Sequence, residues 1–141
     1  SMALERDLEV TGPIKVHLFA ASGCIDTDFT AKLVDVRPDG YAQNLQDGII
    51  RARFRTSASE TSLLKPGNVY EFVIDLWATS HVFRAGHRLR VEISSSNFPR
   101  FDLNPNTGAP LGQDSRLEVA RQTVFHSAAY PSRIVLPIIP R

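Results

Sequence analysis

Few side chains in this sequence have the types and spacing that catalysis requires. An α/β-hydrolase places its nucleophile in a G-x-S-x-G turn, which exposes the hydroxyl beside an oxyanion-binding amide. No such pentapeptide occurs here, and the serines of 94–96 follow a predicted strand, where hydroxyls ordinarily satisfy backbone groups. The histidines have no H-x-x-x-H or H-E-x-x-H spacing; they are His17, His81, His87 and His126. We therefore predict no catalytic residue, no cofactor and no zinc site from spacing, and leave open a metal site assembled by the fold.

One cysteine and two carboxylates lie close together in the first part of the chain. A nucleophilic role is one interpretation of Cys24, but its neighbours have the composition of a turn with no helix N-terminus to activate a thiol. We favour an ordinary half-buried thiol. Asp26 and Asp28 flank Thr27 in a pattern that suits calcium. The same pattern is ordinary in a loop that leads into a strand, and we favour that interpretation.

Three arginines alternate along one predicted strand. Arg51, Arg53 and Arg55 would form a basic stripe that suits a phosphate or a carboxylate-bearing partner. Glu71 and Glu92 lie on the polar faces of other predicted strands, where they are plausible cross-strand partners. We therefore expect a solvated, charge-paired face.

Aromatic residues gather around two predicted loop boundaries. Trp77, Phe83, Phe98 and Phe101 would suit a sugar-stacking platform or a contact surface for another domain. They would equally suit core and loop anchors, because each aromatic side chain buries about 150–250 Å². We take Trp77, Phe98, Phe101 and Asp102 as the candidate surface for contact with a ligand or another domain.

Strands must position these residues, because apolar residues recur with a period of two almost throughout the chain. The clearest segments are 13–20, 49–55, 69–76 and 88–95, and the weaker ones are 4–10, 28–37, 78–84, 117–126 and 133–139. In 28–37 the alternation changes phase between Leu33 and Val34, which predicts a bulge or a strand that crosses between sheets. In 49–55 a slip of one residue would bury three guanidinium groups, so we expect the arginines to face solvent.

Turn-forming residues separate these segments. They are Pro38-Asp39-Gly40, Gln46-Asp47-Gly48, Lys65-Pro66-Gly67 and Arg84-Ala85-Gly86. Short strands at this spacing, with no helical partner, predict an all-β fold, either an antiparallel sandwich or a barrel. The one long polar stretch, 97–114, is rich in Pro, Gly and Asn, and loops of that length are functional or mobile.

Length and composition exclude several classes of protein. The 141 residues fit one domain, and 43% of them are apolar. Sixteen Lys and Arg against fifteen Asp and Glu give a net charge of +1, so we expect no nucleic-acid partner and no membrane partner. A single cysteine excludes an intrachain disulfide, which agrees with a reducing compartment. With no apolar run of membrane-spanning length and no signal-peptide pattern, we expect a soluble, cytoplasmic protein.

A series of strings runs through the chain in one order. They are 8–13 (LEVTGP), 26–36 (DTDFTAKLVDV), 38–40 (PDG), 47–49 (DGI), 86–88 (GHR), 94–100 (SSSNFPR), 106–108 (NTG) and 131–137 (PSRIVLP). Together they resemble the C-terminal domain of the X-Pro dipeptidyl-peptidase and cocaine esterase family, which includes α-amino-acid ester hydrolases and glutaryl-type acylases. The resemblance extends over residues 4–139, and is far more specific than any single motif.

The resemblance implies a jelly-roll β-sandwich of the galactose-binding-domain-like type, packed against an α/β-hydrolase domain. The family's Ser-Asp-His triad lies in that other domain, so no catalytic residue is carried over to this chain. The parent would be a serine hydrolase, an esterase or dipeptidyl-peptidase. Leu103 stands where the family commonly has a basic residue, which weakens any polar role for the 98–108 loop.

We expect residues 3–141 to be a single jelly-roll domain excised from a larger hydrolase, with Ser1-Met2 as a cloning remnant. Since the family's jelly roll usually begins earlier, we also expect its first strand or strands to be missing. A missing strand would leave a sheet edge exposed, which favours a homo-oligomer. The alternative function is a free-standing ligand- or carbohydrate-binding β-sandwich module, which needs an exposed aromatic platform.

Overall fold

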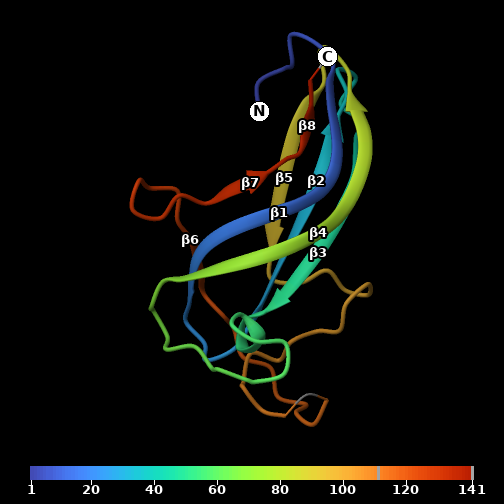
Figure 1. Ribbon diagram of the computed structural model, residues 1–141. Coiled ribbons are helices and arrows are strands. Elements are labelled where there is room, and N and C mark those ends of the chain that lie inside the picture. The colour runs from blue at the N-terminus through green and yellow to red at the C-terminus, as the bar shows by residue number, and fades with distance from the viewer. Residues whose placement is uncertain (111, 141) are drawn as a thin grey trace.

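Two antiparallel β-sheets, stacked face to face, form the protein in a computed structural model that describes residues 1–110 and 112–140 (Figure 1). Its elements are β1 (Leu8–Ser22), β2 (Asp28–Val36), β3 (Ala42–Arg51), the 3-10 helix η1 (Ala52–Phe54), β4 (Tyr70–Phe83), β5 (Arg88–Ser94), β6 (Gln122–Val124), β7 (Arg133–Val135) and β8 (Ile138–Ile139). In the first sheet β1 pairs with β4 on one side and with the short strands β6, β7 and β8 on the other. The second sheet has the order β3-β2-β5.

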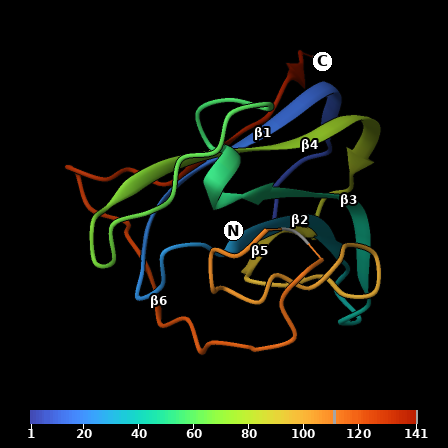
Figure 2. The same cartoon turned by 90° about the horizontal axis from the view of Figure 1, so that it is seen from below.

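The core lies between the two sheets and is built from alternate positions of the long strands. Figure 2 shows the two layers, with β1 and β4 in one and β2, β3 and β5 in the other. Phe29 of β2 contacts Phe72 of β4 across the layers, with ring centroids 4.8 Å apart. The other central residues are Ile14, Val16, Leu18, Ala31, Leu33, Ile74 and Leu76. Burial of each large side chain contributes about 1.5–3 kcal/mol, which makes this layer the main source of stability.

The predicted all-β sandwich is therefore confirmed, whereas the jelly-roll and galactose-binding-like label stays a prediction. Segment 13–20 and the last three residues of segment 4–10 belong to one long strand, β1, which begins only at Leu8; segments 69–76 and 78–84 contribute to β4. The weak segment 117–126 contributes only β6. Within the described part of the chain, no helix is long and apolar enough to cross a membrane.

The predicted irregularity between Leu33 and Val34 is a β-bulge. Leu33 pairs with Gln46 while Val34 pairs with Asn44, so the extra residue, Leu45, belongs to β3. The alternation of β2 itself continues unbroken, since position 35 also faces the interior and reaches β4. The strand therefore does not cross between the sheets.

The predicted turn at 46–48 is wrong, because these residues lie inside β3. A Cβ atom on Gly48 would stand 2.0 Å from the carbonyl oxygen of Asp75 in β4. Nearby, Gln46 Nε2 donates a hydrogen bond of 2.7 Å to the Ala78 carbonyl. Gly48 is thus required for close backbone approach between the two sheets, a role that glycine also has inside strands.

The predicted strand 49–55 is correct only in its first part. β3 ends at Arg51, and the chain turns through η1, where the Ala52 amide donates to the Thr27 carbonyl at 2.8 Å. The turn changes the direction of the side chains that follow. Its cause is the buried carboxylate of Asp26, which draws Arg53 inward.

We expect Gly48→Ala to destabilise the domain by about 3 kcal/mol, the upper end for an overpacked site, because β3 and β4 would have to separate. The measurement is the free energy of unfolding in urea. Gly23→Ala is the matched control, since its new methyl group would meet its nearest neighbour at 3.6 Å, an ordinary contact. Equal effects of the two substitutions would contradict the required close approach.

Candidate functional site

Trp77 lies within β4 and not at a loop boundary, and its side chain is 70% exposed. Leu76 and Trp77 together oppose Ile14 of β1, which makes this position a β-bulge. The backbone of Trp77 has φ of 62°, a left-handed conformation that costs about 1–2 kcal/mol for a residue other than glycine. The Trp77 amide donates to Asp75 Oδ1 at 2.7 Å, which helps to hold the strained position. The fold thus fixes an indole ring in solvent.

Phe98 and Phe101 lie in a turn that follows β5. Phe98 is 70% exposed and Phe101 is partly buried. Asp47 of β3 holds this turn, because it accepts a hydrogen bond from Asn97 Nδ2 at 3.0 Å and forms an ion pair with Arg100, whose Nε lies 2.8 Å from Oδ1. The turn is therefore attached to β3 by a charged pair and an amide.

Asp102 continues this turn toward the end of β3. Its carbonyl accepts a hydrogen bond of 3.4 Å from Arg51 Nη2. A shallow pocket of about 270 Å³ lies here, lined by Ile49, Arg51, Phe54, Phe101 and Asp102. The strand β3 thus contacts both parts of the candidate surface. Asp47 holds the turn that contains Phe98 and Phe101, and the next residue, Gly48, lies against Asp75 and Leu76, which precede Trp77 in β4.

Phe83, the fourth residue of the predicted aromatic group, is separate from this surface. It is fully buried in the core, where its ring packs edge-on against His81 at a centroid distance of 4.8 Å. Phe83 is therefore a core anchor, one of the two roles that the sequence left open.

Two of the three arginines in the predicted solvated stripe are instead drawn into buried ion pairs. Arg53 Nε lies 2.8 Å from Asp26 Oδ2, and the Arg53 amide also donates to this carboxylate. Arg51 donates two hydrogen bonds to Asp28, at 2.8 and 2.9 Å. These hydrogen bonds are the main reason that the pKa of the Arg51 guanidinium is raised, whereas burial alone would lower it. Asn104 Nδ2 joins the pairs, at 3.1 Å from Asp26 and 2.8 Å from Asp28.

The expectation of a solvated arginine face is therefore wrong for Arg51 and Arg53, because two buried carboxylates require cations beside them. The predicted partners have other contacts: Glu71 lies 2.8 Å from His17 Nδ1, and Glu92 lies 3.4 Å from Arg90 Nη1. The oxygens that the calcium interpretation needs are occupied by arginine and asparagine donors. In residues 1–110 and 112–140, no cluster of His, Cys, Asp and Glu side chains is arranged to hold a metal ion.

A second buried carboxylate site escaped the sequence analysis. Asp35 of β2 lies 2.9 Å from His81 Nε2 in the opposite sheet and 2.8 Å from Nδ1 of His87, the residue just before β5. The signal was present, because Asp35 follows Leu33 by two residues and so occupies an inward position. This cluster joins the two sheets through polar contacts.

Cys24 is buried, and its sulfur lies 3.7 Å from the Val119 carbonyl. Burial raises the pKa of the Cys24 thiol, and the charge of Glu118 raises it further. The thiolate is the reactive form of cysteine. Cys24 therefore lacks the activation that a nucleophile needs.

The chain matches a known protein family over most of its length. Residues 1–135 match the family described as the X-Pro dipeptidyl-peptidase C-terminal non-catalytic domain. The chain belongs to this family. A cocaine esterase from Rhodococcus sp. (strain MB1 Bresler) is 48% identical to this C-terminal domain over 136 residues, which cover 95% of this chain and 24% of the esterase.

Solved structures resemble the C-terminal domain over nearly its whole length. An aminopeptidase from the marine sediment archaeon Thaumarchaeota archaeon has a TM-score of 0.93 and 35% identity, covering 99% of this chain and 25% of its own. An α-amino acid ester hydrolase has a TM-score of 0.91 and 33% identity, covering 97% of this chain and 24% of its own. The domain therefore spans about a quarter of the length of these relatives.

In this C-terminal domain, we expect Arg53→Met to lower the free energy of unfolding by about 3–5 kcal/mol, because the substitution leaves the Asp26 carboxylate buried without its cation. Chemical unfolding in urea measures the loss. Arg116→Met is the control, since Arg116 pairs with Glu118 at an exposed site and should contribute less than about 1 kcal/mol. A loss for Arg53→Met as small as that of the control would contradict the structural role of the buried pair.

Proposed function

We propose that this chain is the non-catalytic C-terminal domain of a serine hydrolase that cleaves an ester or amide bond with a Ser-Asp-His triad in another part of the parent chain. The observation that carries this proposal is the 48% identity to a cocaine esterase of which this chain covers 24%. The triad would lie in the remainder.

The proposed work of the domain is to pack on the α/β-hydrolase catalytic domain of the same chain. Trp77, Phe98, Phe101 and Asp102 are the proposed contact surface. Aromatic residues are enriched at the centres of protein interfaces, where they fill pockets on the partner. The strained backbone of Trp77 also supports a functional role, because such positions persist where the surroundings over-determine them.

A cytoplasmic location completes the proposal. One buried, free thiol fits a reducing compartment. The alternative of a free-standing carbohydrate-binding module draws support from the same exposed indole, because sugar sites present an aromatic face. Trp77 is the only tryptophan of the chain, so its fluorescence reports on that surface alone.

We expect the purified 141-residue chain to be silent in ester hydrolysis, because the chemistry is assigned to the remainder of the parent. The assay is turnover of an activated p-nitrophenyl ester, with and without a serine-directed phosphonate inhibitor. The full-length parent is the positive control, and its activity should be abolished by the inhibitor. Inhibitor-sensitive turnover by the chain alone would overturn the non-catalytic assignment.

In the full-length parent, we expect Trp77→Ala to lower the melting temperature of the protein, while the same substitution leaves the isolated chain unchanged. Because alanine keeps the Cβ atom, the backbone strain at position 77 is the same in the parent and in the isolated chain. Only the parent loses an interdomain contact through the substitution. Val119→Ala, which truncates another exposed apolar side chain, is the control. Two results together would favour the carbohydrate-binding module instead. The melting temperature of the Trp77→Ala parent would equal that of the wild-type parent, and sugars would change the Trp77 fluorescence of the isolated chain.

A further inference from the structure

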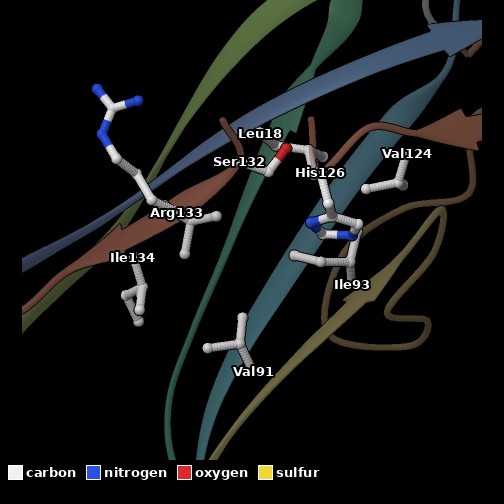
Figure 3. Close-up of a pocket in the computed structure, with 9 residues that line it drawn as sticks. Leu18, Val91, Ile93, Val124, His126, Ser132, Arg133 and Ile134 are labelled. Atoms are coloured by element: carbon white, nitrogen blue, oxygen red, sulfur yellow. The ribbon is translucent and has the colours of Figure 1, made fainter. Parts of the chain in front are cut away.

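An apolar groove of about 430 Å³ opens along one side of the sandwich, between β5 of the second sheet and the strands β1, β6 and β7 of the first. Figure 3 shows Val91 and Ile93 on one wall and Val124 and Ile134 on the other. Small-molecule sites in proteins have volumes of about 300–1,000 Å³ and mostly apolar walls. The groove therefore has the size and the lining of a site for a small ligand.

The arrangement of the strands leaves this groove open to solvent. Leu18 of β1 lies between the positions that pair with β6 and those that pair with β7. On the opposite wall, β5 is the last strand of its sheet. Val91 is consequently 37% exposed, although it shares the inner face of β5 with Ile93. Removal of such apolar surface from water is favourable, so an apolar ligand gains free energy by covering it.

The loop that joins β6 to β7 supplies two hydrogen-bonding side chains to the groove, those of His126 and Ser132. Ser132 follows Pro131, which forms a β-bridge with His126, so both side chains lie at the same end of the groove. Ser132 Oγ accepts a hydrogen bond from the Phe19 amide at 2.9 Å, which leaves its hydroxyl hydrogen as a donor. The His126 ring has no hydrogen-bond partner within the described part of the chain, and Figure 3 shows it beside Ile93.

The lining of the groove favours one charge and one shape of ligand. His126 and Arg133 are its ionisable residues, and both are basic, while none of the described residues that line it is acidic. The Arg133 side chain points away, and its Nη1 donates to the Pro131 carbonyl at 3.2 Å, so its positive charge lies outside the apolar walls (Figure 3). The walls are aliphatic and offer no aromatic ring for stacking. A flexible aliphatic chain that ends in an anion therefore matches the groove.

We propose that the groove binds an aliphatic monocarboxylate of medium chain length. The hydrocarbon chain lies between β5 and β1, and the carboxylate lies at the loop that joins β6 to β7, where the His126 ring and the Ser132 hydroxyl donate to it. Hydrogen bonds to a charged acceptor are stronger than those between neutral groups, so this end fixes the orientation of the ligand. The inference goes beyond the hydrolase assignment and does not rest on it, because it uses the groove alone.

Titration of the 141-residue chain with sodium decanoate, below the concentration at which decanoate forms micelles, tests the proposal. Isothermal titration calorimetry should show saturable binding of one decanoate per chain, and the NMR signals of the groove amides should shift. Decanol has the same chain without the charge, and butyrate has the same charge on a short chain. Each of these two probes should bind at least about tenfold more weakly than decanoate, because each lacks one of the two contacts.

Two substitutions separate the carboxylate contact from the apolar contact. His126→Ala should weaken decanoate binding about tenfold and leave decanol binding unchanged, because only the charged end uses the ring. Val91→Trp should abolish the binding of both probes, because the larger side chain fills the groove from a partly exposed position. His17→Ala is the matched control, since His17 pairs with Glu71 on the outer face of β1. Circular dichroism checks that each variant is folded.

Absence of saturable decanoate binding overturns the proposal and leaves the groove to a segment of a longer chain. Equal affinities for decanoate and decanol, or an unchanged decanoate affinity in the His126→Ala variant, overturn the carboxylate end of the site. Decanoate binding that Val91→Trp leaves intact overturns the groove as the place where the chain lies. Each of these results leaves the hydrolase assignment untouched, because none of them measures ester or amide cleavage.

Discussion

The burial of two carboxylates organises the end of the molecule that carries the candidate surface. Asp26 is completely buried, and a carboxylate that leaves water costs several kcal/mol unless a cation and hydrogen bonds replace the solvent. Arg53 is therefore drawn inward, which ends β3 and sets the turn of η1. Arg53 Nη2 also donates to the Ala109 carbonyl at 3.0 Å, and Asn104 bridges both carboxylates. Residues 97–110 of the long polar stretch are thus attached to the sandwich by hydrogen bonds and ion pairs.

The charged residues of this domain hold its structure together, so few of those described are left for catalysis or metal binding. Arginines, aspartates and histidines that would suit catalysis or a metal are paired with one another and hold loops and sheets together, as Asp35 does with His81. What remains exposed is of another kind: the indole of Trp77, the ring of Phe98 and the unpaired edge of β5. These are features of a domain that contacts other protein surfaces, and they agree with membership of a non-catalytic domain family.

Much of the fold follows from the alternation of apolar residues, because one buried face is enough to define a strand. The β2 segment, the β5 segment and the inward faces of β1 and β4 could be predicted in this way, whereas the bulge expected in β2 has its extra residue, Leu45, in β3. Two features could not. The role of Gly48 depends on a carbonyl from β4, a segment distant in sequence, and glycine in a string with Asp47 is equally typical of a turn. The direction of Arg53 depends on Asp26, and a periodic pattern carries no information on whether a buried charge will find a partner. The candidate surface could be named from the sequence, but its attachment to β3 through Asp47 could not.

The central claim is that this domain acts by presenting a preformed surface to the rest of a hydrolase. Amide hydrogen exchange, compared between the isolated chain and the full-length parent, tests it most directly. The claim predicts stronger protection in the parent at the Trp77 bulge and in residues 97–102, with unchanged protection in the core strands β1 and β2. Equal exchange at the Trp77 bulge and the 97–102 turn in both proteins would contradict it.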